Sequence, residues 1–410
     1  MESIKGYLKS CALHEVNTTK GLVMKNTITA LLVSSLISGA ALAIERPSDA
    51  ELHAYKAYHH AEYLEITAKS AGGTNKLIHT TTLPTEGNDP VVSPALDHLY
   101  SKAVVDLTEG PVILTLPEVK DRYFSLHVTD QEHFTIYDEI RPVGKYVFVR
   151  HNYQGDVPEG SIIESRGNYP HIFIRTQVFE PAEIDNVISI QEMIGLEGIT
   201  KELKIKDEDY VQFTIESHDV YPQNAGLLDS VASSYSPEEH AEIRSYLYNW
   251  YAQSGLFTNE GAFGPIDSDE EHSNDPVLRA AGIIGHLGLP VHHAIYAPIF
   301  ITCDGERLNG SNNYSITIPY DNPGVDEFWS VTRYSQITGN TVPGAQDVFN
   351  AYNTKPDENG NVTITFSSTE PNDGTYWMPV NENEPYYFVE RYYAPDMNKL
   401  VTAADSCPTP

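Results

Sequence analysis

Basic residues, cysteines and long apolar runs are scarce in this 410-residue sequence. It contains 26 Lys and Arg against 57 Asp and Glu, which gives a formal net charge of −31. Such a balance repels phosphate backbones and anionic lipids, so we expect no nucleic-acid partner and interpret the acidic excess as a solvated surface. Beyond a short N-terminal stretch there is no run of about 18 apolar residues, and we expect no membrane insertion of the mature chain.

The motifs of common catalytic sites are also missing. The sequence has no G-x-S-x-G, no P-loop, no G-x-G-x-x-G after a strand, and no H-E-x-x-H or C-x-x-C. The usual signatures of hydrolases, nucleotide-binding proteins and local zinc sites are therefore absent. The adjacent pairs His59-His60 and His292-His293 do not replace them, because neighbouring side chains point apart on a helix or strand. The sequence predicts no metal site and no cofactor.

One acidic loop, at residues 267–271, begins like the calcium loop of an EF-hand. His272 and Leu278 occupy the positions where that loop needs a glycine and a bidentate glutamate. This departure excludes an EF-hand. We interpret the segment as a solvated loop, with loose cation binding as the alternative.

The first 43 residues have the pattern of a secretory leader. A short basic region starts at Met24, residues 28–36 are apolar, and an A-x-A sequence ends at Ala43. This pattern predicts cleavage of a signal peptide after Ala43 and a location in the periplasm or outside the cell. Residues 1–23 do not fit the leader, so we expect translation to begin at Met24.

The cysteine content is consistent with export. Cys11 lies upstream of the expected cleavage, which leaves Cys303 and Cys407 in the mature chain. An even pair in an oxidising compartment can form a disulfide. Closing a loop of about a hundred residues would contribute up to roughly 4–5 kcal/mol in the chain-entropy model. The alternative is two unpaired thiols.

Period-two alternation dominates two parts of the chain. Short alternating segments fill residues 91–176, and residues 310–395 repeat the pattern between Asn-Gly, Asp-Gly and Pro-Gly turns. The aromatic content of 26 Tyr against 13 Phe and 3 Trp suits half-buried strand positions. The sequence therefore predicts a mainly β fold with helical connections (α+β overall), built from two β-sandwich or jelly-roll-like domains.

Helical patterns occur before and between these β segments. Ser48 and Ser236 each begin a capping box, and apolar residues recur at helical spacing over 181–195 and 277–287. We expect four parts: an upstream extension and leader over 1–43, an N-terminal helix and β domain over 44–200, a helical linking region over 201–300, and a C-terminal β-sandwich over 301–410.

Polar residues on otherwise apolar strands are the candidates for a site. An arginine beside aromatic rings can bind carboxylate or sugar groups, and a tyrosine near a cation can act as acid or base. The alternative is structural, with each arginine paired to a buried carboxylate such as Asp106 and with Trp329 in the core. The candidate catalytic residues are Asp97, Tyr100, Arg122 and Tyr123, and the candidate ligand-binding residues are Trp329, Arg333 and Arg391.

Several segments, in a fixed order, resemble a known exported family. In the first half they are Leu-Tyr-Ser-Lys-Ala-Val-Val-Asp-Leu at 99–107, Pro-Val-Ile-Leu at 111–114 and Arg-Tyr-Phe-Ser-Leu at 122–126. In the second half they are at 308–314, 328–332, 377–379 and 391–395. The chain thus resembles the family with an N-terminal domain of unknown function 1254 and a C-terminal domain of unknown function 1214. The resemblance implies export and a C-terminal jelly-roll-like β-sandwich.

One segment of that family is altered in this chain. The family commonly carries Pro-Asn-x-Asp-Thr-x-Tyr in its first half, whereas residues 94–100 are Pro-Ala-Leu-Asp-His-Leu-Tyr. Pro94, Asp97 and Tyr100 remain, while Ala95 and His98 replace the asparagine and the threonine. If this segment builds a site, its chemistry is changed here.

These observations favour a protein that binds a saccharide or another small polar ligand in a cleft between its two domains. A first alternative is a lyase or hydrolase that acts on an envelope or environmental polymer. Its acid/base would be Tyr100 or Tyr123 beside Arg122, oriented by Asp97 or Asp106. A second alternative is a structural or assembly protein without a ligand.

Overall fold

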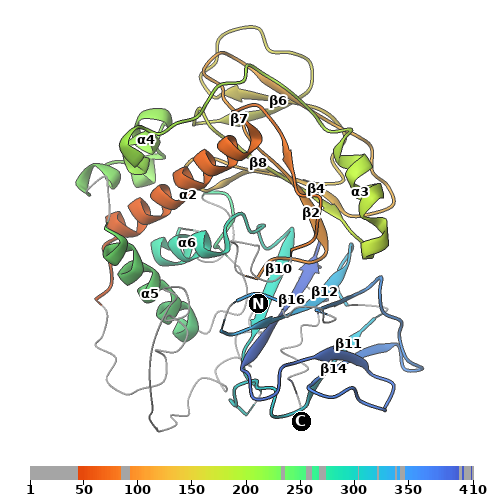
Figure 1. The fold of residues 1–410 in the computed structure, drawn as a ribbon. Coiled ribbons are helices and arrows are strands. Elements are labelled where there is room, and N and C mark those ends of the chain that lie inside the picture. The colour runs from red at the N-terminus through yellow and green to blue at the C-terminus, as the bar shows by residue number, and fades with distance from the viewer. Residues whose placement is uncertain are drawn as a thin grey trace.

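Two β-sandwiches and a layer of helices make up the part of the chain that the computed structural model describes (Figure 1). The mainly β, two-domain prediction is confirmed. The described residues are 45–84, 93–231, 236–254, 261–266, 274–302, 304–320, 323–337, 339–341, 347–396, 399–400 and 408. Three predictions lie outside them: the signal peptide with its cleavage after Ala43, the acidic loop at 267–271, and the disulfide between Cys303 and Cys407.

The N-terminal sandwich contains nine strands. They are β1 (Ile78–His79), β2 (His98–Val104), β3 (Val112–Leu116), β4 (Phe124–Thr129), β5 (Thr135–Ile140), β6 (Gly144–Arg150), β7 (Ser161–Ser165), β8 (His171–Gln177) and β9 (Gly195–Glu197). The order is β1-β2-β8-β4-β5 in a five-stranded sheet and β7-β6-β3-β9 in a four-stranded sheet. Phe124, Leu126 and Val128 share one face of β4 and lie in the core of this domain, as their alternation predicts.

The C-terminal sandwich contains seven strands. They are β10 (Ala294–Ile299), β11 (Tyr314–Pro319), β12 (Trp329–Ser335), β13 (Val348–Asn350), β14 (Asn361–Ser367), β15 (Tyr376–Pro379) and β16 (Tyr386–Tyr393). The order is β10-β16-β12-β13 in one sheet and β11-β14-β15 in the other. Their shared core includes Tyr386, Phe388 and Tyr392 of β16, which lie on one face as predicted, and Trp329 of β12.

Five α-helices and five 3-10 helices are described. They are α2 (Asp49–Ala71), α3 (Ile184–Gln191), α4 (Tyr210–Ser217), α5 (Pro237–Ser254), α6 (Pro276–Gly282), η2 (Pro181–Glu183), η3 (Lys206–Glu208), η4 (Pro222–Asn224), η5 (Leu228–Ser230) and η6 (Ile283–Gly285). The predicted capping box is present, because Ser48 and Glu51 exchange backbone-to-side-chain hydrogen bonds, and Gly72 ends α2 at φ 81°. None of the described helices is both long and apolar enough to cross a bilayer.

One predicted helix is shorter than its pattern. The helical spacing covers residues 181–195, but α3 ends at Gln191 and the chain turns into β9. Strand β9 pairs with β3, with Ile113 opposite Glu197. This pairing across the sheet satisfies backbone groups that a longer helix would have bonded within itself, so tertiary structure overrides the local period.

Helix α2 positions one wall of the candidate site. It lies across the five-stranded sheet, with α4, α5 and α6 beside it (Figure 1). Leu52 and Tyr55 of α2 pack with Leu247 of α5 and Val277 of α6 in a single apolar cluster. The other side of α2 carries His53, Lys56 and His60, all buried, and this placement puts polar side chains inside the protein.

Candidate functional site

The central strands β4 and β8 of the five-stranded sheet are buried on both faces, but only one face is apolar. The strand register places Tyr100 opposite Arg175, Ser125 opposite Arg175, and His127 opposite both Phe173 and Asp138. These residues alternate with the apolar ones that fill the N-terminal core. We term this side the polar face, and it comprises His98, Tyr100, Lys102, Ser125, His127, Asp138, His171, Phe173 and Arg175.

Several buried nitrogens on the polar face have no hydrogen-bond partner among the described residues. They are both ring nitrogens of His98 and of His171, Nδ1 of His127 and one terminal nitrogen of Arg175. Buried polar atoms are normally satisfied, and a group of exceptions needs water, an ion or a ligand to explain it. We therefore take the polar face as the candidate functional site.

A hydrogen-bonded relay crosses the domain boundary at one end of this face. The hydroxyl of Tyr123 lies 2.8 Å from Nε2 of His293, and Nδ1 of His293 lies 3.0 Å from Oδ2 of Asp138. Since a carboxylate only accepts, His293 donates through Nδ1, and its Nε2 accepts from the tyrosine hydroxyl. His292 also binds Asp138, at 2.8 Å, and its side chain is 58% exposed, so the relay ends at the surface.

Burial and the hydrogen bonds set the protonation of this relay. Burial raises the pKa of Tyr123 above its usual range and lowers the pKa of His293. Burial alone would also raise the pKa of Asp138, but hydrogen bonds from His292 and His293 outweigh it and hold the pKa well below its usual range. At neutral pH the relay consists of a tyrosine hydroxyl, an imidazole and a carboxylate. This is an arrangement able to hold and move a proton.

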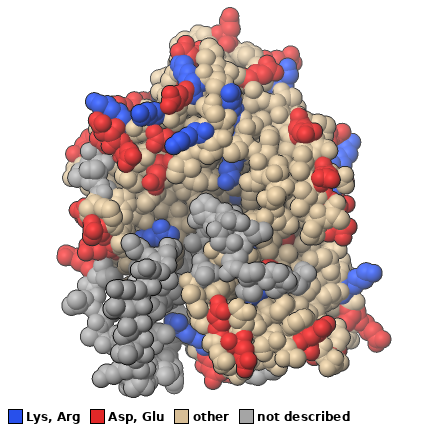
Figure 2. All heavy atoms as spheres, in the orientation of Figure 1, with Lys and Arg blue, Asp and Glu red and all other residues tan. Residues whose placement is uncertain are grey.

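Two cations on the polar face have no carboxylate partner among the described residues. Arg175 is buried, donates to the carbonyl of Leu287 at 2.6 Å, and has its guanidinium carbon 4.6 Å from the centre of the Phe173 ring. Lys102 donates to the hydroxyl of Tyr63 at 2.9 Å, with Nζ 5.2 Å from the same phenylalanine ring. By contrast, Asp and Glu form patches scattered over the surface shown in Figure 2. Arg175 and Lys102 thus differ from the acidic surface in sign and have no carboxylate of the described residues beside them.

At the other end of the face, histidines gather from three separate segments. His60 comes from α2, His133 from the turn between β4 and β5, and His286 from the segment after η6. One nitrogen of each lies within 4.8 Å of the other two, and Nδ1 of His60 lies 2.9 Å from Nε2 of His286. Burial lowers the pKa of His60 to about 4 and the pKa values of the other two well below the usual range, so all three are neutral at pH 7.

Asp97 and Arg391, both predicted site residues, lie at the junction between the domains. Asp97 is fully buried and accepts from Ser330 Oγ at 2.7 Å and from Asn350 Nδ2 at 3.1 Å, both in the C-terminal domain. Arg391 donates to the carbonyl of Ser93 at 2.8 Å, and also to Thr332 and Tyr334. These contacts fasten the altered family segment to the C-terminal sandwich.

The other predicted residues divide between the polar face and the sheet edges. Tyr100 is half-buried on the polar face, and Tyr123 is buried beside it. Arg122 donates to the carbonyl of Gln177 and to Asp121, away from Tyr123's hydroxyl partner. Arg333 pairs with Asp347, and Trp329 lies in the C-terminal core. The fold therefore does not bring all seven candidates to one place.

Sequence reasoning missed the residues that carry most of the chemistry. Asp138, Arg175 and His293 were not among the candidates, nor were the three clustered histidines. A signal did exist for part of the set: His127 and Arg175 occupy the strand positions that alternate with core residues and would normally face solvent. Burial of that second face could not be inferred from the strands themselves.

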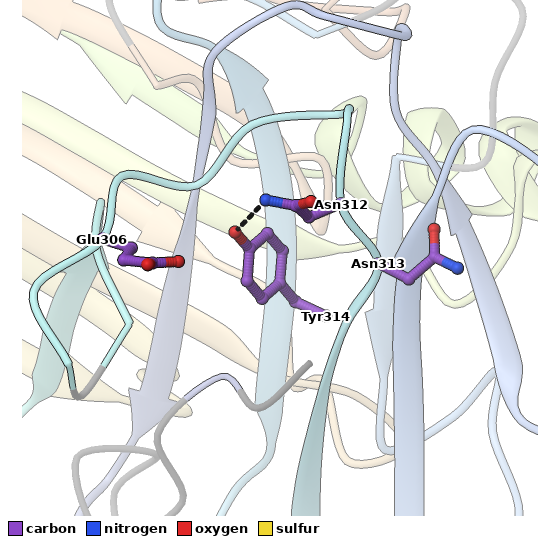
Figure 3. Close-up of a pocket in the computed structure, with 4 residues that line it drawn as sticks. All are labelled: Glu306, Asn312, Asn313 and Tyr314. Carbon is purple, nitrogen blue, oxygen red and sulfur yellow. Dashed lines mark hydrogen bonds between the residues drawn. The ribbon is translucent and has the colours of Figure 1, made fainter.

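A separate surface pocket offers less chemistry. It has a volume of about 350 Å³ and is lined by Glu306, Asn312, Asn313 and Tyr314 (Figure 3). Asn312 donates to the hydroxyl of Tyr314 at 3.1 Å. Among the described residues of this lining Glu306 is the single charged one, so they offer no charged pair for acid/base chemistry. The polar face remains the candidate site.

Comparison with known proteins identifies two family models in this chain. The model "Protein of unknown function (DUF1254)" matches residues 74–198, and "Protein of unknown function (DUF1214)" matches residues 293–397. This confirms the two-part resemblance noted in the sequence. Tyr123 and Asp138 lie in the first match and His293 begins the second, so the relay joins the two family domains. No protein with a curated description matches the chain.

Two solved structures resemble the fold. The VPA0106 protein from Vibrio parahaemolyticus has 19% sequence identity and a TM-score of 0.66, and the similarity covers 86% of this chain and 95% of that chain. An uncharacterized protein from Burkholderia cenocepacia has 12% identity and a TM-score of 0.47, over 84% of each chain. The first similarity supports the fold alone.

Proposed function

The chain belongs to the family that joins an N-terminal DUF1254 domain to a C-terminal DUF1214 domain, and we propose that it binds a small polar ligand with an anionic group on the polar face. The single observation that carries this proposal is the buried guanidinium of Arg175, which has no carboxylate partner among the described residues. An uncompensated buried charge costs several kcal/mol, so a protein that keeps one needs an anion to bind there. A carboxylate of the ligand fits this role because arginine binds it through two parallel hydrogen bonds.

The surroundings of Arg175 favour a sugar acid over a simple inorganic anion. The rings of Tyr100 and Phe173 lie 4.9 Å apart beside the guanidinium, and Tyr63 lies across from Lys102. Aromatic rings pack against the apolar faces of sugar rings, while the unpartnered histidine nitrogens can bond to hydroxyl groups. This deepens the expectation of a saccharide or another small polar ligand between the domains.

A calorimetric comparison of matched sugars tests the proposal. Glucuronate and galacturonate should bind and raise the melting temperature, while glucose and galactose should bind at least about tenfold more weakly, because loss of a charged hydrogen bond costs about 1.5–3 kcal/mol. Arg175→Gln should abolish the preference for the acids. Arg150→Gln is the matched control, since Arg150 pairs with Asp219 outside the polar face. If no sugar, polyol or carboxylate stabilises the protein, the structural role becomes the better hypothesis.

The relay of Tyr123, His293 and Asp138 favours a second candidate, a lyase or hydrolase acting on an acidic polymer. In such an enzyme the tyrosine would exchange a proton with the substrate, with His293 holding it in turn. Incubation with acidic polysaccharides should then release shorter products. Tyr123→Phe should lower the rate by about 100-fold or more, measured at a temperature where the variant is still fully folded. Equal rates for the variant and the parent chain would exclude this role for Tyr123.

We also propose that the protein works outside the cytoplasm, on the basis of the leader pattern ending at Ala43. Expression of the full chain in a Gram-negative host should yield a periplasmic or secreted form whose first residue is Ile44. Mass spectrometry of the purified form measures this directly. An uncleaved product confined to the cytosol would contradict it.

A further inference from the structure

The histidine cluster at the end of the polar face has the dimensions of a metal site. One nitrogen from each of His60, His133 and His286 lies within 4.8 Å of the others. Ligands of a tetrahedral centre with metal–nitrogen bonds of about 2.1 Å lie about 3.4 Å apart, so these atoms need to move together by no more than about 1.4 Å. Small side-chain rotations are enough for such a shift.

We propose that His60, His133 and His286 bind one divalent transition-metal ion, with Zn²⁺ as the expected occupant. Three imidazole nitrogens suit zinc and its neighbours in the transition series, whereas calcium and magnesium prefer oxygen ligands. Three protein ligands leave one position of a tetrahedral zinc ion for water or a ligand group, which is the pattern of catalytic rather than structural zinc.

Unsatisfied atoms within the cluster support a missing cation. Nε2 of His60 and Nδ1 of His133 are buried and have no hydrogen-bond partner in the described part of the chain. His171 lies next to them, fully buried, with neither ring nitrogen bonded and its ring centre 6.1 Å from that of His60. Hydrogen bonds among the described residues therefore do not explain why several imidazoles are buried together.

The backbone around the cluster is also held in an uncommon conformation. His133 and Leu287 both have positive φ, 61° and 62°, and the amide of Leu287 donates to Nε2 of His133 at 3.3 Å. A side chain as bulky as leucine rarely adopts this region, and such residues concentrate where a site needs fixed geometry.

Charges of both signs lie near the cluster, and Arg279 donates to the carbonyl of His133 at 3.1 Å. Asp130 and Glu132 are fully buried and precede His133 in the same turn. Both also lie near His218, at 3.5 Å and 3.4 Å from its ring nitrogens. Carboxylates in this position offset the charge of a metal held by neutral imidazoles and orient the surrounding histidines.

This proposal is independent of ligand binding at Arg175. His60 and His286 lie outside the residues that either family model matches, so membership of the family assigns them no role. Metal binding can be measured without any organic ligand, and its failure would leave the calorimetric result with sugar acids unchanged.

The experiment uses the full chain, purified without an affinity tag and dialysed against a chelator. Titration with Zn²⁺ should give one equivalent bound per chain, and Co²⁺ should produce the visible absorption of a tetrahedral nitrogen-bound ion. His60→Gln, His133→Gln and His286→Gln should each weaken Zn²⁺ binding by at least about 100-fold, since outer-shell partners alone contribute 10–100-fold.

His98→Gln is the matched control, because His98 is equally buried and unpartnered but contacts Tyr123 and Tyr393 instead. It should keep the wild-type affinity. Should the cluster variants fail to fold, nitrogen NMR of the wild-type imidazoles provides the test, with three rings expected to shift on addition of one equivalent of Zn²⁺. The proposal is overturned if the folded chain shows no saturable binding, or if His98→Gln weakens binding as much as the cluster variants do.

Discussion

The hydroxyl of Tyr123 lies 2.8 Å from Nε2 of His293, so the residue before β4 in the N-terminal domain contacts the first residue of the C-terminal family match. Both side chains are buried, and the histidine passes the contact on to Asp138. One chain of hydrogen bonds therefore connects the two domains. Stability measurements and rate measurements separate its structural role from the proton transfer of the second proposed function.

Tyr123→Phe should lower the free energy of unfolding by about 1–3 kcal/mol, because it leaves Nε2 of His293 buried without a donor. Urea denaturation measures the change. A double-mutant cycle with His293→Gln isolates the contact, and the two losses should add up to more than the loss in the double variant. Strictly additive losses would mean that the hydrogen bond contributes nothing.

Asp97→Ala should lower the free energy of unfolding by about 3–5 kcal/mol, since it removes the buried acceptor of Ser330 and Asn350 and a carboxylate that acts on Arg391. Scanning calorimetry should show the single transition of the parent chain separating toward two, because these contacts cross the domain boundary. Asp97→Ala combined with Arg391→Met should recover part of the loss.

The matched control for Asp97 is Asp156→Ala. Asp156 is exposed in the loop before β7, and its replacement should change the free energy of unfolding by no more than about 0.5 kcal/mol. If the Asp97 variant were as stable as this control, Asp97 would not be the fastening between the domains.

Lys56 should make stability increase with pH above neutrality. The side chain is 2% exposed, and burial, with the nearby Arg279, lowers its pKa to about 7. Its pKa in the unfolded chain is about 10.5, so between these values the unfolded state holds more protons and stability rises by up to about 1.4 kcal/mol per pH unit. Below pH 7 both states are protonated and this contribution is constant.

Urea denaturation at pH 7, 8 and 9 measures this slope, and Lys56→Met is the comparison. The methionine keeps most of the apolar stem but cannot titrate, so its stability should vary less across the same range. A parent chain and a variant with parallel pH profiles would show that Lys56 stays charged when buried.

Ser48→Ala should lower the free energy of unfolding by about 1 kcal/mol, the usual effect of removing an N-cap. The amide of Glu51 donates to the serine hydroxyl at 3.2 Å, and the serine amide donates back to the Glu51 carboxylate at 2.7 Å. Ser70→Ala is the control, because Ser70 is exposed near the other end of α2. Equal effects of the two substitutions would mean that the capping box does not stabilise α2.

The fold was predictable where the decisive residues lie close together in the chain. Alternation placed Phe124, Leu126 and Val128 on one face of a strand, and the same pattern placed Tyr386 and Phe388 in the second core. The helix predicted to continue over residues 192–195 does not form. The chain there leads into β9, which pairs with the distant strand β3, and this pairing cannot be inferred from the local spacing of apolar residues.

The residues of the candidate site also fall into those that the sequence could indicate and those that it could not. Asp97, Tyr100, Tyr123 and Arg391 could be selected as polar residues on apolar strands, and they do lie at or near the domain junction. Their partners could not be selected, because nothing in the strands indicates that the second face of a sheet is covered. Helix α2 and the segment after η6 cover it, and that makes His171 and Arg175 interior rather than surface residues.

By itself, the sequence determined the acidic balance, the alternating strands, the capped helix and the family, since each depends on composition or on residues a few positions apart. Only the tertiary structure decided which polar groups meet. Tyr123 and His293 are 170 positions apart, and His60 and His286 are 226 apart. Contacts over such separations arise from how sheets and helices pack. This packing produces no periodic pattern in the sequence from which the contacts could be predicted.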